Sequence, residues 1–277
     1  MKNIKILTIF LSFVILSSCQ KVIDVKIDQG ATQLSVDGEI TDQFGPYTIM
    51  LTKTQNYFNN NPALGVKGAI VIINDSDGIV DTLKEISEGK YQTNKLLGKI
   101  GNKYNLYVKS AEFGEYSAQT EIRRAFKFDT IYSKYEEDDF SFKKQMQYDV
   151  RYSYTDNKGL GDAIRVKYYI NDTLQNKPDD LEFHSDENVD GNQIKDLRVN
   201  RKALKVNDKV TIKLLSITHD YFQFLTELEK QINNGGLFSN PPANVRTNIL
   251  NKDPNGIKAT GYFRGISLRL KDVVVTK

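Results

Sequence analysis

The chain has 277 residues, and its 38 lysines and arginines against 35 aspartates and glutamates give a formal net charge of +3. With 39% apolar and 10% aromatic residues it can fold around a hydrophobic core, which excludes general disorder. Its charges are spread along the chain without basic clusters, which excludes nucleic acid as a partner. The length suits two modest domains or one large all-β unit.

Residues 1–18 have the pattern of a signal peptide. Two lysines precede the uncharged apolar run Ile6–Leu16, whose 11 residues suit an export signal. A membrane-spanning helix would need about 20 apolar residues. The run ends in Leu16-Ser17-Ser18-Cys19, an aliphatic residue, two small residues and a cysteine, which resembles the bacterial lipobox. We expect cleavage before Cys19 and attachment of palmitate and other acyl chains to that residue.

Cys19 is the only cysteine of the chain. Once its thiol carries lipid, the mature protein can form no disulfide and depends on packing for its stability. Two or more acyl chains, at about 0.8 kcal/mol per buried methylene group, anchor a protein durably in a membrane. The sequence therefore predicts a lipid-anchored protein outside the cytoplasm, with residues 19–33 as a polar tether.

Residues 34–124 have the pattern of a β-sandwich. Apolar and polar side chains alternate over residues 47–52, as in a half-buried strand. Apolar runs at 69–73 and 79–83 flank the turn sequence Asp75-Ser76-Asp77-Gly78 and predict a hairpin. A second hairpin is predicted around Glu112-Phe113-Gly114-Glu115. These short strands and frequent turns favour an immunoglobulin-like or transthyretin-like sandwich.

Residues 125–277 predict a second antiparallel β domain that contains one helix. The alternating stretches 148–154 and 164–170 predict two strands that pair with each other. Apolar residues at helical spacing predict a helix near 218–234, with Thr218 as its N-cap and Gly235-Gly236 as its stop. The four acidic residues at 136–139 are expected to form a solvated loop.

Few residues offer catalytic or metal-binding chemistry. His184 and His219 are the only histidines, and neither belongs to a Gly-x-Ser-x-Gly or His-Glu-x-x-His motif. We therefore expect no enzymatic activity, no cofactor and no catalytic metal. The segment Asp186-x-Asn188-x-Asp190-Gly191 has the oxygen spacing of a calcium loop, but Leu197 stands where the bidentate carboxylate belongs. A polar hairpin turn is the favoured interpretation of this segment.

Two segments are candidate contact surfaces. Tyr57 and Phe58 precede a polar Asn-rich loop, where their rings would stack on a sugar or anchor a protein partner. Phe238, Pro241 and Pro242 follow the predicted helix and could dock a neighbour. The alternative, which the composition favours, is that Tyr57 and Phe58 fold back over the sandwich edge and that the second segment covers the helix.

Several segments of the mature chain carry a family resemblance. They are Val22-Ile23-Asp24 after Cys19, Val36-Asp37-Gly38-Glu39-Ile40-Thr41, Gly45-Pro46-Tyr47-Thr48, Phe128-Asp129-Thr130-Ile131-Tyr132, Ser216-Ile217-Thr218-His219-Asp220-Tyr221-Phe222, Gly235-Gly236-Leu237-Phe238-Ser239-Asn240-Pro241-Pro242 and Gly261-Tyr262-Phe263. Together they resemble an outer-membrane lipoprotein family of Gram-negative bacteria that is catalogued as a domain of unknown function, DUF4249. The resemblance implies a two-part β-rich lipoprotein, similar to ones encoded beside TonB-dependent receptors, and it implies no reaction.

Two functions remain in view. The first is a non-enzymatic lipoprotein that works with a TonB-dependent receptor in nutrient uptake, where it holds a ligand or shapes the complex. The second is a hydrolase of glycans or peptides whose carboxylates are brought together by folding, as glycoside hydrolysis requires at about 5 to 9 Å. The lack of a catalytic motif favours the first function. The ligand and the face of the outer membrane stay open.

Overall fold

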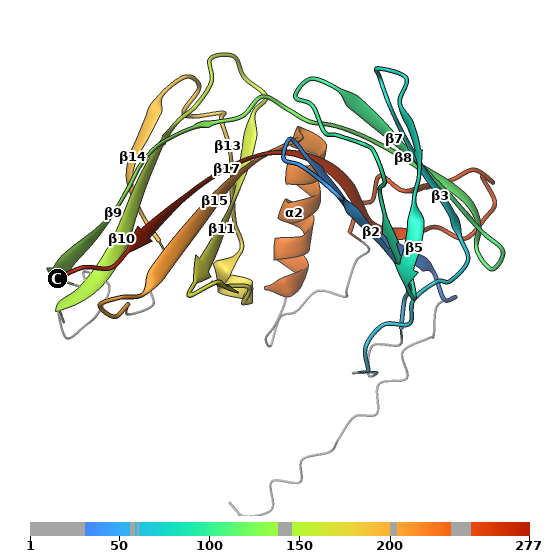
Figure 1. Cartoon of the computed structure of the whole chain (residues 1–277), viewed down its shortest axis with the longest axis horizontal. Helices are drawn as coiled ribbons and strands as arrows, with labels where there is room; N and C mark the ends of the chain where they lie inside the picture. Colours follow the sequence, from blue (N-terminus) through green and yellow to red (C-terminus); the bar gives the residue numbers. More distant parts are fainter. Residues whose placement is uncertain (1–30, 56–58, 60, 138–145, 200–203, 234–244) are drawn as a thin grey trace, which may run out of the picture. The chain divides into compact units, whose positions relative to one another are not determined.

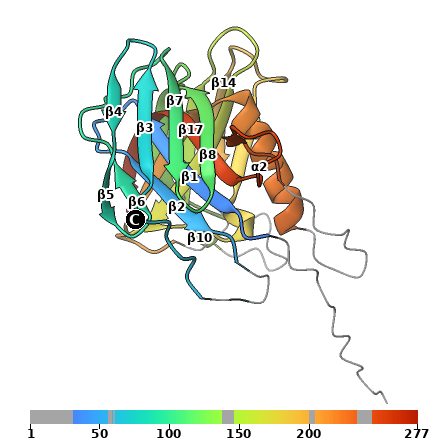
Figure 2. The same cartoon turned by 90° about the vertical axis from the view of Figure 1, so that its right-hand side faces the viewer.

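The computed structural model describes residues 31–277 except 56–58, 60, 138–145, 200–203 and 234–244. Its contacts divide the chain into Met1–Ala31 and Thr32–Lys277, and the second unit holds all the described strands and helices (Figures 1 and 2). This unit is mainly β, with sheets whose strands pair antiparallel except for one parallel pair, and with a single α-helix among the described residues. The predicted fold class is confirmed.

The strands form three sheets. The largest has the order β12 (Thr173–Leu174), β11 (Ala163–Ile170), β15 (Lys209–Ile217), β17 (Thr260–Val274), β1 (Leu34–Thr41), β2 (Thr48–Lys53), β6 (Lys90–Gln92), β5 (Lys84–Ser87), with β13 (Glu182–Ser185) also paired to β11. A three-stranded sheet has the order β14 (Gln193–Arg198), β10 (Met146–Thr155), β9 (Lys127–Glu137). The third sheet has the order β16 (Leu250–Asn251), β8 (Gly114–Glu121), β7 (Lys103–Ser110), β3 (Ile70–Asp75), β4 (Val80–Thr82).

The largest sheet joins the two halves of the chain through its first and last strands. β1 and β17 run parallel, with Val36 opposite Gly261 and Gly38 opposite Phe263. β17 then continues as the antiparallel partner of β15, so one strand of 15 residues serves both halves (Figure 1). Gly261 has a φ of +87°, and a Cβ there would lie 2.1 Å from the carbonyl oxygen of Val36. Only glycine fits this close approach.

The first hydrophobic core lies between two sheets, as the sandwich predicted for residues 34–124 requires. Val36 and Ile49 from β1 and β2 meet Val71 and Leu106 from β3 and β7. Figure 2 shows β3, β7 and β8 layered over β1 and β2. Both predicted hairpins, β3–β4 and β7–β8, are confirmed. Phe263 of β17 is fully buried in the same core, so the C-terminal strand completes the N-terminal sandwich.

The second core lies between the three-stranded sheet and the β11–β15 part of the largest sheet. The predicted pairing of 148–154 with 164–170 is wrong, because β10 pairs with β9 and β14 while β11 pairs with β12, β13 and β15. The two strands instead face each other across the core, where the ring centroids of Tyr152 and Tyr168 lie 6.5 Å apart. Alternation of apolar and polar residues shows that one face of a strand is buried. Two such faces meet when two sheets pack on each other, as well as when two strands pair in one sheet.

The expected boundary near Arg124 falls between the two cores. Ile122 belongs to the first core and Phe126 to the second. Thr32–Lys277 nevertheless forms one compact unit by its contacts, because β1 and β17 link the cores within one sheet. The two halves therefore have separate cores and a shared sheet, and their folding as separate domains stays a prediction.

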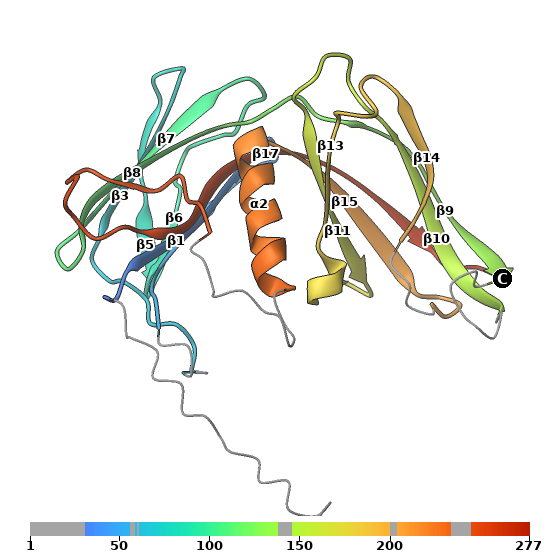
Figure 3. The same cartoon turned by 180° about the vertical axis from the view of Figure 1, so that it is seen from behind.

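The helix expected near 218–234 is α2 (His219–Ile232), which lies beside β11 and β13 (Figure 3). The Thr218 hydroxyl is the N-cap and accepts a hydrogen bond from the Tyr221 amide at 3.2 Å. Buried Tyr221 and Leu225 pack on a third apolar cluster of the largest sheet. The predicted stop at Gly235-Gly236 lies outside the described residues. Within the ranges that the structure describes, no helix is long and apolar enough to cross a membrane.

The solvated loop expected at 136–139 is wrong for Glu136, because β9 extends through it to Glu137. Asp138 and Asp139 lie outside the described residues. Glu136 accepts a hydrogen bond from Nε of Arg151 at 2.9 Å, and its other oxygen lies 2.7 Å from Nζ of Lys134. Burial opposes ionisation, but these bonds outweigh it and lower the pKa of Glu136 to about 2. Its stabilising effect is therefore complete above the unfolded pKa of about 4.5 and is lost as the pH falls towards 2.

We expect Glu136→Gln to lower the free energy of unfolding at pH 7 by about 1–2 kcal/mol, with allowance for solvent screening. Denaturant titrations from pH 7 down to pH 2 should show the difference between variant and wild type shrinking as Glu136 takes up a proton. Glu88→Gln is the control, because its ion pair with Lys67 is exposed and should contribute little. A loss that does not change with pH would contradict the ionic explanation.

Candidate functional site

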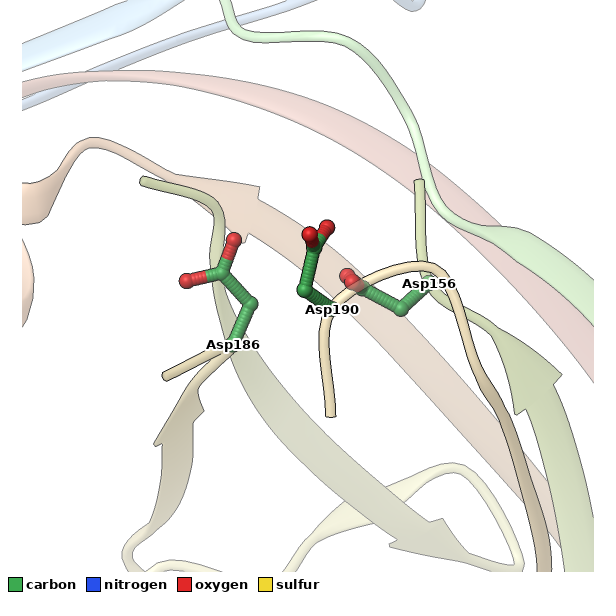
Figure 4. A group of neighbouring side chains, drawn as sticks. All are labelled: Asp156, Asp186 and Asp190. Atoms are coloured by element: carbon green, nitrogen blue, oxygen red, sulfur yellow. The ribbon is translucent and has the colours of Figure 1, made fainter. Parts of the chain in front are cut away.

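Three aspartates meet beyond the ends of β10 and β13. Asp156 follows β10, Asp186 follows β13, and Asp190 lies in the turn that leads to β14. One carboxylate oxygen from each lies within 4.8 Å of those of the other two, and Figure 4 shows the three side chains together. Asp156 and Asp186 are buried, whereas Asp190 is exposed. We call this group the aspartate cluster.

Backbone amides hold the aspartate cluster in place. Asp186 and Asp190 accept hydrogen bonds from amides of the loop 159–162, at distances of 2.6, 2.9 and 3.2 Å. Asp156 accepts one from the amide of Gly191 at 2.9 Å. These bonds tie the loop between β10 and β11 to the turn after β13, and they do so with groups of the chain itself.

The calcium-like spacing in the sequence identified two members of this cluster, Asp186 and Asp190. The structure brings Asp186 and Asp190 together and adds Asp156 from a different strand end, which no local pattern indicates. The polar turn is present at 186–191, but the predicted hairpin is wrong, because β13 pairs with β11 and β14 with β10. Three carboxylates suit a hard cation such as Ca²⁺. Over the ranges described, this is the one group of three or more metal-ligating side chains.

The aspartate cluster carries unbalanced negative charge. Burial, followed by the charges of Asp162 and Asp186, raises the pKa of Asp156 against the effect of its backbone hydrogen bond. Asp162 is also buried, but it is neutralised by Arg124 at 2.7 Å and Arg123 at 3.3 Å. Because the folded state binds the proton of Asp156 more tightly than the unfolded state does, ionised Asp156 destabilises the fold at neutral pH.

We expect Asp156→Asn to raise the free energy of unfolding at pH 7 by about 0.5–1 kcal/mol, because the neutral amide keeps an oxygen for the Gly191 amide and removes like-charge repulsion. The gain should disappear near pH 3, where the wild-type carboxyl is protonated. Denaturant titrations with EDTA and with CaCl2 test this. A wild-type gain in CaCl2 that Asp156→Asn lacks would contradict the polar-turn interpretation and identify a cation site.

A cleft of about 480 Å³ lies beside the Asp162 ion pairs. Arg123 and Arg124 line it, but both are bound within the chain, Arg123 also to Glu121 at 3.0 Å. Its other walls include the exposed side chains of Ile100 and Leu160. The cleft therefore offers apolar contacts rather than free charges.

A second polar group surrounds the first turns of α2. Tyr262 of β17 donates a hydrogen bond to Asp220. Arg246 lies 3.9 Å from Asp220 and 2.7 Å from Glu227. Burial and the bond to Asp220 raise the pKa of Tyr262, and the hydrogen bonds from Arg246 lower the pKa of Glu227. These contacts fix the beginning of the helix to β17.

The segments 216–222 and 261–263, which carry part of the family resemblance, meet at this corner. The ring centroid of Tyr262 lies 4.9 Å from those of Tyr221 and Phe224. An adjoining cavity of about 250 Å³ is lined by Lys103, Thr120, Thr218, Asp220, Asn248 and Tyr262. Most of these polar groups already bond within the chain; Asn248, for example, donates to the carbonyls of Gln119 and Phe263. These internal bonds favour a structural role for the residues at this corner.

The two histidines occupy surface positions in neighbouring elements. His219 is the first residue of α2, where its ring stacks on Phe222 at 5.8 Å and its Nε2 lies 3.0 Å from the Gln223 side chain. His184 is on β13, 3.5 Å from Glu182. In the contacts of the described residues, neither imidazole is joined to both a nucleophile and a carboxylate, as a catalytic triad would require.

The other residues singled out from the sequence cannot be placed in the fold. The expected lipid attachment site, Cys19, and the candidate contact residues Tyr57, Phe58, Phe238, Pro241 and Pro242 all lie outside the described residues. Their roles stay predictions.

Comparison with protein-family models identifies a family for this chain, whereas no curated protein matches it. The family described as Domain of unknown function (DUF4249) matches residues 20–269, which include most strands of all three sheets and α2. The chain therefore belongs to the DUF4249 family, the one that its sequence motifs resemble.

Proposed function

We propose that the protein is an outer-membrane lipoprotein without enzymatic activity that serves a TonB-dependent nutrient uptake system as a ligand-holding or accessory component. The position of the single cysteine carries this proposal. Cys19 follows an export signal and two small residues, as lipid attachment requires, and the chain has no second cysteine with which it could form a disulfide. Membership of the DUF4249 family supports the proposal, because the resemblance to this family implies an outer-membrane lipoprotein.

The polar tether gives the anchored protein its reach. Residues 19–33 would span at most about 50 Å when fully extended, at about 3.3–3.6 Å per residue. The body that begins at β1 can therefore stand clear of the lipid headgroups and contact a neighbouring receptor. With residues 1–18 removed, 36 basic side chains balance 35 acidic ones, so attraction by net charge is negligible.

Metabolic labelling tests the anchor. Cells grown with labelled palmitate should incorporate the label into the wild-type protein and not into Cys19→Ser. Both proteins should unfold at the same temperature, because Cys19 precedes the described fold. Equal labelling of the two proteins, or none of either, would contradict the lipoprotein assignment.

Affinity capture in mild detergent tests the partner. The full-length protein should retain a TonB-dependent outer-membrane barrel, identified by mass spectrometry, and the double variant Tyr57→Ala/Phe58→Ala should retain less of it. Phe44→Ala is the control, because this ring lies between β1 and β2 and is 91% exposed. Repeated capture without any barrel would contradict the receptor partnership.

The hydrolase alternative would need a pair of working carboxylates. The aspartate cluster brings carboxylates together, but backbone amides from two loops bind them and fix a turn. This arrangement favours a structural role. A glycan or peptide hydrolysis rate that is lost in both Asp156→Asn and Asp186→Asn, in proteins that remain folded, would establish the alternative.

A further inference from the structure

Four basic side chains project from one face of the largest sheet, the face against which α2 packs. Arg165 and Lys167 lie on β11, Lys213 on β15 and Arg264 on β17. Arg165 is opposite Leu215, whose apolar cluster packs on the helix, and Lys167 is opposite Lys213. We call these four residues the basic patch. All four are partly buried.

The two carboxylates of β1 neutralise only one member of the basic patch. Arg264 binds both of them, with Nε 2.9 Å from Glu39 and Nη1 2.6 Å from Asp37. Arg165 donates a hydrogen bond to the Tyr221 hydroxyl at 2.8 Å, which leaves its charge uncompensated. The same face also carries Lys209 and Asp272, which pair with each other at 3.6 Å. The positive charge left without a carboxylate therefore belongs to Arg165, Lys167 and Lys213, on β11 and β15.

Lys167 and Lys213 form the least satisfied part of the basic patch. They are direct cross-strand partners, a position in which like charges destabilise a sheet. Lys213 lies over the ring of Tyr169 at 4.5 Å. Neither lysine belongs to an ion pair within the ranges that the structure describes. An unpaired, partly buried ammonium pair costs stability, which a bound anion would restore.

The electrostatics of Lys167 agree with this geometry. Burial lowers its pKa, and although Glu39 attracts its charge, Arg165, Arg264 and Lys213 all oppose ionisation. Among the described residues, Glu39 forms its ion pair with Arg264 and not with Lys167. The missing counter-charge would have to come from outside the described fold.

We propose that the basic patch binds the anionic oxygen group, a carboxylate or a phosphate, of a small solute, with Arg165, Lys167 and Lys213 as its donors. This inference rests on the proposed function, because it gives the chemical class of the ligand that the lipoprotein would hold. Charge-assisted hydrogen bonds from lysine and arginine are the strong contacts for such groups. The partly buried position beside α2 admits a small anion more readily than a flat lipid surface.

Calorimetric titration of the full-length protein in a neutral detergent tests the inference. Citrate and inorganic phosphate are the probes, at pH 7 and at a constant ionic strength set with NaCl. We expect both probes to bind the wild type, and Lys167→Gln to weaken the binding at least about tenfold, as expected for the loss of one charge-assisted contact. Lys95→Gln is the matched control, because Lys95 is an exposed lysine that follows β6, a strand near the opposite edge of the largest sheet from β11.

A thermal melt without anions shows whether the variant is folded. Lys167→Gln should be at least as stable as the wild type, because it removes a charge that repels its neighbours. Binding that is absent in the wild type, or equal in Lys167→Gln and the wild type, would overturn the inference. So would binding to phosphatidylglycerol micelles without binding to citrate or phosphate, which would assign the patch to a lipid headgroup. Any of these results beside normal palmitate labelling and receptor capture would leave the proposed function intact.

Discussion

Replacing Phe263 by alanine is expected to lower the free energy of unfolding by about 3–5 kcal/mol, as for other buried rings. The Phe263 side chain is fully buried in the first core although it belongs to β17, the last strand. It lies opposite Gly38, where a Cβ would come 2.5 Å from the Ile49 side chain and 3.0 Å from the ring. The ring and Ile49 therefore fill together the space that this glycine leaves.

This variant also decides whether the two halves fold as separate domains. The sequence predicts two domains, but β17 carries residues of both cores. From the structure we therefore expect a single unfolding transition that moves to lower denaturant concentration as a whole. Far-ultraviolet circular dichroism and tyrosine fluorescence should report the same midpoint. Phe44→Ala, at a ring 91% exposed, is the control and should change stability by less than about 0.5 kcal/mol. Two transitions, of which only one moves, would show independent domains.

Replacing Arg198 by methionine is expected to cost about 3–5 kcal/mol at pH 7, because it leaves the buried carboxylate of Asp149 without its partner. Asp149 on β10 is 1% exposed, and Nε of Arg198 on β14 lies 2.7 Å from one of its oxygens. A second contact, from Nη2 of Arg198 to the other oxygen, is 3.0 Å long. The pair thus connects two strands of the three-stranded sheet through one hydrogen bond, from Nη2, and through the close approach of opposite charges at Nε.

The pH dependence of this loss distinguishes charge from packing. Burial, above all, raises the pKa of Asp149 even with Arg198 present, so the orphaned carboxyl should take up a proton as the pH falls and regain part of the lost stability. The double variant Asp149→Leu/Arg198→Met should recover most of it at pH 7. Lys109→Met is the control, because Lys109 and Glu115 form an exposed pair. An equal loss in the single and double variants would point to packing instead.

The sequence predicted those elements whose partners are near in the chain. The turn at Asp75–Gly78 specifies its hairpin because a tight turn places the two strands that it joins side by side. Thr218 and the apolar spacing after it specify α2, since a helix makes its backbone bonds within itself. The strands at Tyr152 and Tyr168 were also recognised, but alternation shows which side chains are buried and not which strand lies alongside.

The groups with candidate chemistry depended on distant pairing and were less predictable. Asp186 and Asp190 lie close in the sequence, and their spacing indicated them. Asp156 lies near them only because β10 ends beside the turn that contains them. The basic patch gave no signal at all. Lys167 and Lys213 look like the solvated positions of two ordinary strands, and only the register that sets them opposite each other reveals the unbalanced charge.

The pairing of β1 with β17 has a consequence for the export that we propose. A precursor led by an N-terminal signal would enter the secretion channel from its first residue, so Leu34 would emerge long before Thr260. β1 would then have one of its two neighbouring strands only after β17 had emerged. Contacts so far apart in sequence slow folding. Under this proposal, the arrival of the last strand is the step that allows the central sheet to close.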